Sequence, residues 1–147
     1  MLRPVKLGHI VLRVRDLERS KRFYTDVLGL RQTGQIEERM AFFSCGQDSH
    51  DLAVIAIGPD AAPPEPGRVG LYHFAYQVAT AEELGDWHAH LKSQAVTIIG
   101  TTDHGVALGI YFLDPDGNEL EVTYEKPASE WPQDVNPFAG DAPLNFE

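Results

Sequence analysis

Cysteine is almost absent from this chain of 147 residues, because Cys45 is its only cysteine. A single cysteine excludes an intrachain disulfide, and we expect Cys45 to be a small buried side chain. No apolar run approaches the roughly 20 residues needed to cross a bilayer, and the first residues lack the apolar stretch of a signal peptide. These absences predict a cytoplasmic protein that does not span a membrane.

Basic residues are also scarce. The chain has 12 lysines and arginines against 22 aspartates and glutamates, a formal net charge of −10. Because no cluster of lysine and arginine is interleaved with aromatic residues, nucleic acid and anionic membranes are poor candidates as partners. The length and the hydrophobic fraction of 43% instead predict one compact domain with its own core.

What the sequence does contain is an internal repeat. Residues 7–14 alternate apolar and polar side chains, as a half-buried strand does, and a capped amphipathic helix and three short strands follow. Residues 71–78 begin the same series again. The pattern predicts an α+β fold in which two βαβββ modules, at about 5–57 and 70–125, form a curved mixed sheet within one domain of residues 1–126.

Two segments lie outside this repeat. Residues 58–67 are rich in proline and glycine, so we expect a linker or a lid there rather than a helix or a central strand. Residues 127–147 carry four prolines, several acids and three aromatic residues. We expect an irregular tail whose aromatic side chains dock on the domain or on a partner.

Three polar side chains stand on the less apolar faces of predicted strands, and two of them occupy equivalent places in the repeat. His9 lies on the first strand, His73 on its counterpart in the second module, and Glu121 on the last strand. Two imidazoles and one carboxylate suit non-haem Fe(II) and oxygen chemistry, although Zn, Mn, Ni or Mg use related ligands. Each histidine alone is an ordinary strand residue, but the duplication favours a metal site where the modules meet.

The stretch 102–121 predicts a loop with His104, a strand with Tyr111, a tight Asp-Pro-Asp-Gly turn at 114–117 and a returning strand with Glu121. An earlier strand begins with His50. Alone, these histidines and this tyrosine are unremarkable, since loop histidines are commonly solvated and strand tyrosines commonly packed. The turn has a sufficient structural explanation, so we assign it no chemistry.

Three segments resemble the vicinal oxygen chelate superfamily, which is also called the glyoxalase/bleomycin resistance/dioxygenase superfamily. They are LGHIVLRVRDLE at 7–18, FYTDVLG at 23–29 and LDPDGNELE at 113–121, and the resemblance covers about residues 5–125. The superfamily includes glyoxalase I, fosfomycin resistance enzymes, bleomycin-binding proteins and type I extradiol dioxygenases, so the fold alone does not choose a function. The stretch 102–121 is most similar to the extradiol dioxygenases, in which a loop histidine, an apolar-tyrosine pair, Asp-Pro-x-Gly and a ligand glutamate follow one another.

The resemblance implies a single-domain, catechol 2,3-dioxygenase-like enzyme that cleaves a catechol-type aromatic diol with O2. It implies Fe(II), or Mn(II) with its overlapping ligand preferences, bound by His9, His73 and Glu121. It also assigns roles to three further residues: His50 as the acid-base group, Tyr111 as a hydrogen-bond donor to a substrate oxygen, and His104 as a residue on the substrate side. A homodimer or larger homo-oligomer is expected.

Two other functions stay open. A metal-dependent isomerase or thiol transferase of the glyoxalase or fosfomycin-resistance kind more often uses a glutamate in catalysis, and has no need of His50, His104 and Tyr111 together. A protein that sequesters a drug or an aromatic metabolite without turnover needs no metal. The ring substituents, the position of cleavage and the oligomer size do not follow from the sequence.

Overall fold

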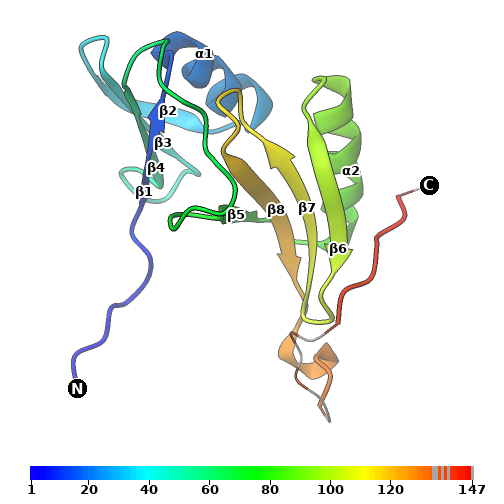
Figure 1. The fold of residues 1–147 in the computed structure, drawn as a ribbon. Coiled ribbons are helices and arrows are strands. Elements are labelled where there is room, and N and C mark those ends of the chain that lie inside the picture. Colours follow the sequence, from blue (N-terminus) through cyan, green and yellow to red (C-terminus); the bar gives the residue numbers. More distant parts are fainter. Residues whose placement is uncertain (134–135, 137, 139, 147) are drawn as a thin grey trace. The chain divides into compact units, whose positions relative to one another are not determined.

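The computed structural model describes residues 1–133, 136, 138 and 140–146, so parts of the predicted tail, at 134, 135, 137, 139 and 147, lie outside the described residues. The chain divides into two compact units, Met1–Pro63 and Pro64–Glu147, each built around one four-stranded mixed sheet (Figure 1). Both units run strand, helix and three strands. The predicted α+β fold of two repeated βαβββ modules is confirmed.

The first unit consists of β1 (Ile10–Val14), α1 (Leu17–Arg22), a π-helical turn (Phe23–Val27), β2 (Arg31–Ile36), β3 (Met40–Ser44) and β4 (Leu52–Ala56). The sheet order is β1-β4-β3-β2, with β1 parallel to β4 and the other pairs antiparallel. The Asp16 carboxylate accepts the Arg19 N–H at 2.8 Å, which caps α1 as predicted. Gly29, with a φ of 68°, ends the helical segment.

The apolar face of β1 is the buried one, as its alternation predicted. Leu12 and Val14 are buried, whereas Val11 and Arg13 are exposed. The helical segment packs on β3 and β4, and the rings of Tyr24 and Phe43, 5.7 Å apart, join it to the sheet. The first unit therefore has its own apolar core.

The prediction that Cys45 is buried is wrong. Cys45 is an exposed free cysteine, because it follows the last residue of β3 and enters the turn toward β4. Its backbone N–H donates to the Asp51 carboxylate at 2.6 Å, and partial burial together with the neighbouring Asp51 carboxylate raises the pKa of its thiol.

The second unit consists of β5 (His73–Gln77), α2 (Ala81–Ser93), β6 (Ile98–Asp103), β7 (Ala107–Leu113), β8 (Glu119–Glu125) and a 3₁₀ turn (Ala128–Glu130). The sheet order is β5-β8-β7-β6, with β5 parallel to β8 and the other pairs antiparallel. The Thr80 hydroxyl caps α2 by accepting the Glu83 N–H at 3.3 Å, and the Glu83 carboxylate accepts the Ala79 N–H at 3.0 Å. Strand β6 stays paired with β7 as far as Asp103.

Helix α2 covers one face of this sheet by packing on β7 and β8 (Figure 1). Its side of the contact includes the fully buried Leu84 and Leu91. The sheet contributes Ile110, Phe112 and Leu120, which are also fully buried. This leaves the opposite face of the sheet free to carry polar side chains.

Asp114 organises the turn between β7 and β8. Its Oδ1 accepts the backbone N–H groups of Asp116 and Asn118, and its Oδ2 accepts the Asn118 side-chain amide, each at 2.8 Å. Gly117 has a φ of 89°, which favours glycine. The hairpin turn expected at 114–117 is therefore confirmed.

We expect Asp114→Ala to lower the free energy of unfolding by about 2 to 3 kcal/mol, because three hydrogen bonds to a buried carboxylate are lost. Asp114 is 4% exposed, so water does not readily replace it. Urea unfolding would measure the effect, with Asp60→Ala in the exposed segment after β4 as the control. Equal stability of the two variants would show that the turn does not depend on Asp114.

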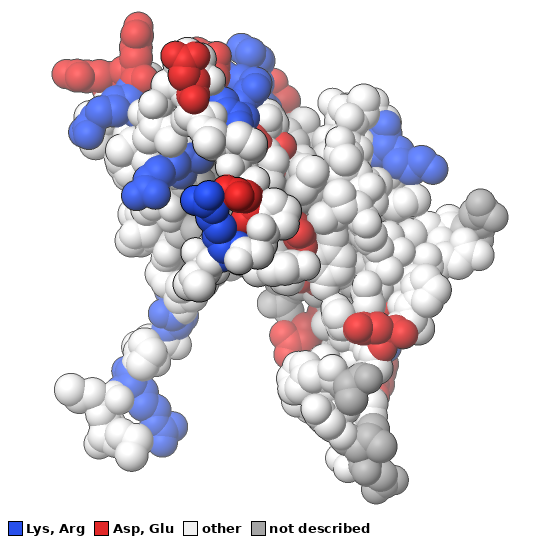
Figure 2. All heavy atoms as spheres, in the orientation of Figure 1, with Lys and Arg blue, Asp and Glu red and all other residues white. Residues whose placement is uncertain are grey.

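The surface carries charges of both signs. On the face shown in Figure 2, the described lysines and arginines are scattered, several of them beside aspartates and glutamates, and they form no continuous basic patch. Among the described residues, no helix is both long enough and apolar enough to span a bilayer.

Candidate active site

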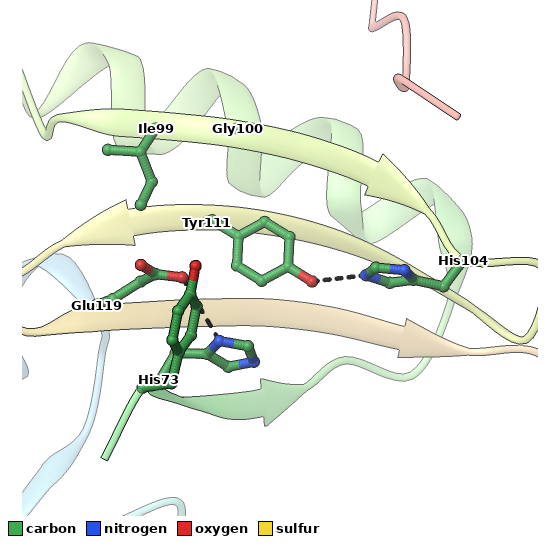
Figure 3. Close-up of a pocket in the computed structure, with 7 residues that line it drawn as sticks. His73, Ile99, Gly100, His104, Tyr111 and Glu119 are labelled. Carbon is green, nitrogen blue, oxygen red and sulfur yellow. Dashed lines mark hydrogen bonds and ion pairs between the residues drawn. The ribbon is translucent and has the colours of Figure 1, made fainter. Parts of the chain in front are cut away.

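A pocket of about 350 Å³ lies against the sheet of the second unit (Figure 3). Its volume falls at the lower end of the range found for small-molecule sites. Apolar and aromatic surface stands beside a few convergent polar groups, a combination that suits a small ring carrying polar substituents. The lining residues are Tyr72, His73, Ile99, Gly100, His104, Tyr111 and Glu119.

Strand register explains why these side chains meet. On the parallel pair β5 and β8, His73 lies opposite Glu119, two residues before Glu121. On the antiparallel pair β7 and β8, Tyr111 lies opposite Glu121. Residues that are opposite, or two apart on one strand, share a face of the sheet. All four side chains therefore project from the same face.

His73 lies between two carboxylates. Its Nε2 is 3.4 Å from Glu121 Oε2, and its Nδ1 is 3.5 Å from Glu119 Oε1. Both distances exceed an ordinary hydrogen bond, and the buried Nδ1 has no hydrogen-bond partner among the described residues. Nitrogen and oxygen ligands bind metals at about 2.1 Å, so two adjacent ligands of one cation lie about 3 Å apart. His73 Nε2 and Glu121 have nearly that spacing.

Glu119 completes a familiar arrangement around a metal-binding histidine. Such a histidine commonly donates the N–H that does not face the metal to a carboxylate, which sets the orientation of the ring. Glu119 lies on the Nδ1 side of His73, away from Glu121. Nε2 is thus the atom of His73 that fits a metal bond, and the donor set fits a divalent cation.

A close approach of the backbone makes room for the Glu121 carboxylate, which is only 7% exposed. A Cβ atom at Gly109, on β7, would lie 2.2 Å from Glu121 Oε1 and 3.1 Å from its carboxyl carbon. Real Cβ atoms do not approach another heavy atom as closely as 2.2 Å. The absence of a side chain at Gly109 therefore leaves the space that the Glu121 carboxylate occupies. The sequence did not identify this role, although a glycine inside a strand often marks a close approach of the backbone to another group.

Tyr111 and His104 form a polar pair at the pocket. The Tyr111 hydroxyl is 2.8 Å from His104 Nε2, and the Tyr111 ring is 5.3 Å from the His73 ring (Figure 3). Burial raises the pKa of Tyr111, and the negative charge of Glu121 and a hydrogen bond with it raise the pKa further. Tyr111 therefore stays a neutral phenol at neutral pH and keeps the O–H proton that it can donate.

His9 and His50 lie together in the first unit. Their ring centroids are 4.4 Å apart, and the edge of Phe42 meets the His50 ring at 5.4 Å. Ser49 Oγ lies 3.0 Å from His50 Nδ1, which leaves Nε2 of His50 for another contact. His50 is thus a direct neighbour of a predicted metal ligand.

The six predicted site residues fall into two groups in the structure. One group is His9 and His50, and the other is His73, His104, Tyr111 and Glu121. Within the part of the chain that the structure describes, no three His, Cys, Asp or Glu side chains form a ready-made metal cluster. His9 belongs to the first unit, and the other two proposed ligands belong to the second. The set of three ligands stays a prediction.

Residues 6–122 match the Glyoxalase/Bleomycin resistance protein/Dioxygenase superfamily, and the chain belongs to this superfamily. It is 34% identical over 129 residues to the catechol-2,3-dioxygenase of Bacillus subtilis (strain 168), a match that covers 87% of this chain and 44% of that protein. It is 29% identical over 117 residues to biphenyl-2,3-diol 1,2-dioxygenase 2 of Rhodococcus globerulus, covering 80% of this chain and 61% of the relative. The chain thus spans about half the length of these two dioxygenases.

A third relative has a different activity. The glutathione transferase FosA of Serratia marcescens is 32% identical over 117 residues, which cover 79% of this chain and 78% of the relative. A glyoxalase/dioxygenase from Nostoc punctiforme matches in structure with a TM-score of 0.72 at 23% identity, over 86% of this chain and 97% of that one. A lactoylglutathione lyase from Agrobacterium tumefaciens matches with a TM-score of 0.66 at 22% identity, over 82% of this chain and 94% of that one. At these identities, the structural matches establish the fold alone.

Proposed function

We propose that this protein is a non-haem Fe(II)-dependent extradiol dioxygenase that cleaves the ring of a catechol-type aromatic diol. The observation that carries the proposal is the placement of His73 Nε2 3.4 Å from the Glu121 carboxylate, beside the Tyr111–His104 pair at the pocket. Similarity to two diol-cleaving dioxygenases supports the same choice. Mn(II) is the alternative metal, and we expect a homodimer or larger assembly.

The metal would be held by His73 Nε2, Glu121 and, from the first unit, His9. Bound there, Fe(II) would bring the diol and O2 together and pass charge between them. Tyr72 and Ile99 would pack on the substrate ring and keep water from its face. Glu119 would keep His73 oriented by accepting its Nδ1 proton.

Proton handling would fall to the remaining polar residues. His50 would take a proton from a diol hydroxyl and return it later, a general acid-base task that histidine performs most often in enzymes. Tyr111, held neutral by burial and by Glu121, would donate its O–H to a substrate oxygen. His104, at the rim of the pocket, would line the substrate side and hold the Tyr111 hydroxyl.

A metal-dependent transferase or isomerase is the second candidate, because the match to FosA covers 79% of this chain and 78% of FosA. This function would use the same His73 and Glu121 but would consume no oxygen. It would also leave the His50 acid-base role and the Tyr111–His104 pair without a purpose. Oxygen uptake therefore separates the two functions directly.

The deciding experiment is anaerobic reconstitution with Fe(II), followed by air and a panel of catechols that includes bicyclic and substituted diols. We expect yellow ring-opened product with matching oxygen consumption. Metal binding without oxygen uptake on the whole panel would favour the transferase or isomerase. Absence of metal binding would favour a protein that sequesters an aromatic ligand.

Replacing His50 by phenylalanine should leave Fe(II) binding intact and lower kcat for ring cleavage by about 100-fold or more. A phenyl ring occupies the same space against His9 and Phe42 but carries no proton. Iron content and steady-state kinetics would be measured together, with His90→Phe on α2 as the control. Wild-type turnover in the His50 variant would remove His50 from the mechanism.

A further inference from the structure

The carboxy-terminal segment 141–146 runs along the free edge of β6 (Figure 1). Ala142 exchanges both backbone hydrogen bonds with Asp103, at 2.7 and 3.1 Å, which makes an antiparallel bridge. The Thr101 hydroxyl donates to the Leu144 carbonyl at 3.3 Å, and the Phe146 ring stacks on His88 of α2 with centroids 4.6 Å apart. The segment is thus attached at three points of the second unit.

This attachment places the Asp141 carboxylate beside His104. Asp141 Oδ1 lies 2.6 Å from Nδ1 of His104, and Nε2 of the same ring lies 2.8 Å from the Tyr111 hydroxyl. Asp141 comes directly before the residue that bridges to Asp103, and His104 comes directly after Asp103. The two side chains therefore meet because the bridge aligns their backbones.

The backbone of His104 is already held by its own loop. The His104 N–H donates to the Ala107 carbonyl at 2.9 Å, and the Asp103 carboxylate accepts the Gly105 N–H at 2.7 Å and binds Lys126 Nζ at 2.8 and 3.0 Å. What remains free is the rotation of the His104 ring and the position of its protons. The two side chains that face its nitrogens, Asp141 and Tyr111, set both.

We propose that Asp141 is a positioning residue, which keeps a proton on Nδ1 of His104 and so reserves Nε2 for Tyr111. An ionised carboxylate accepts hydrogen bonds only, so Nδ1 beside it carries a proton. With one ring proton, Nε2 accepts the Tyr111 O–H. With two, Nε2 donates to the phenol oxygen, which leaves the O–H to donate to Glu121 or to a ligand in the pocket. In both states Asp141 makes Nε2 the atom that directs the Tyr111 hydroxyl.

The structural part of this proposal stands on geometry alone, whereas its consequence for catalysis rests on the proposed function. The segment 141–146 is then part of the site, although it lies more than 15 residues beyond the last strand. Because the Asp141 side chain is 75% exposed, solvent weakens the pair. We therefore expect a moderate effect, in which Asp141→Ala lowers kcat about three- to fivefold and leaves KM within about twofold.

The test combines kinetics with nitrogen-15 NMR of the His104 ring in the metal-free protein. We expect Asp141→Ala to lose the fixed Nδ1 proton, and Asp141→Asn to keep it and regain part of kcat, because an amide oxygen still accepts a hydrogen bond. Glu130→Ala removes a carboxylate from the same tail and should change neither. Ala142→Pro removes the N–H that bonds to Asp103 and should reproduce Asp141→Ala, whereas Ala142→Gly should not.

Each result supports or overturns a distinct part of the proposal. An unchanged His104 signal in Asp141→Ala would overturn the positioning role, whatever the activity. A changed signal with wild-type kcat would overturn the catalytic consequence. If the wild-type protein cleaves no diol, the proposed function fails, and the NMR comparison still decides whether Asp141 orients His104.

Discussion

Glu121→Ala should abolish tight Fe(II) binding and ring cleavage while leaving the fold intact. The change removes the proposed anionic ligand, which lies 3.4 Å from His73 Nε2, and the other two proposed ligands are imidazoles. We expect metal affinity to fall at least about 1,000-fold, equivalent to roughly 4 kcal/mol. The free energy of unfolding of the metal-free protein should change by no more than about 2 kcal/mol. Anaerobic Fe(II) titration, iron content and thermal unfolding would measure these quantities.

Two other glutamates of β8 provide graded controls. Glu125 is exposed at the end of the strand, so Glu125→Gln should match the wild type. Glu119 lies on the Nδ1 side of His73, so Glu119→Gln should weaken metal binding by about 10- to 100-fold, the usual cost of losing a carboxylate that orients a ligand. Full metal occupancy and turnover in Glu121→Ala would refute the assignment of Glu121 as a ligand.

Gly109→Ala should weaken metal binding by about 100-fold, although it adds a single methyl group outside the proposed ligand set. The new Cβ would lie 2.2 Å from Glu121 Oε1, so the carboxylate has to rotate away from its present position beside His73. The displaced atoms are the end of a flexible side chain. We therefore expect a loss of stability of only about 1 to 2 kcal/mol, and a larger relative effect on metal affinity than on folding.

The same methyl group at Gly100, on the neighbouring strand β6, meets no atom within 4 Å. Gly100→Ala should therefore retain Fe(II) affinity, which makes it the control for metal binding. A double-mutant cycle sharpens the test, because the clash disappears when the Glu121 side chain is absent. Gly109→Ala in the Glu121→Ala background should cost little further stability. Equal costs in both backgrounds would contradict the steric explanation.

Local patterns predicted most of the fold. Alternation along β1 and β5 identified the buried faces, and Asp16 and Thr80 marked the starts of both helices. The helix predicted after Asp16 is present and begins as an α-helix at Leu17. Its second half is π-helical, with the Leu28 N–H donating to the Phe23 carbonyl at 3.1 Å. Apolar periodicity over so few residues does not distinguish the two kinds of helix.

The candidate site was only partly accessible to such patterns. His73, Tyr111, His104 and Glu121 were named from the sequence, and the structure brings these four together. Glu119, Gly109 and Asp141 were not among the predicted site residues. Glu119 and Gly109 lie in the stretch 102–121 that resembles the extradiol dioxygenases, but the resemblance assigned them no role. Each acts by its distance from another side chain.

The sequence by itself determined the repeat, the strand and helix faces, the turn at Asp114 and the types of ligand available, because these depend on neighbours a few positions apart. Tertiary structure alone decided which atoms face each other. Pairing of β5 with β8 placed His73 between two carboxylates, and the approach of β7 at Gly109 shaped the space for one of them. The bridge from Ala142 to Asp103 brought in a carboxylate from the tail. Such contacts join residues a dozen to several tens of positions apart, so no local periodicity records them.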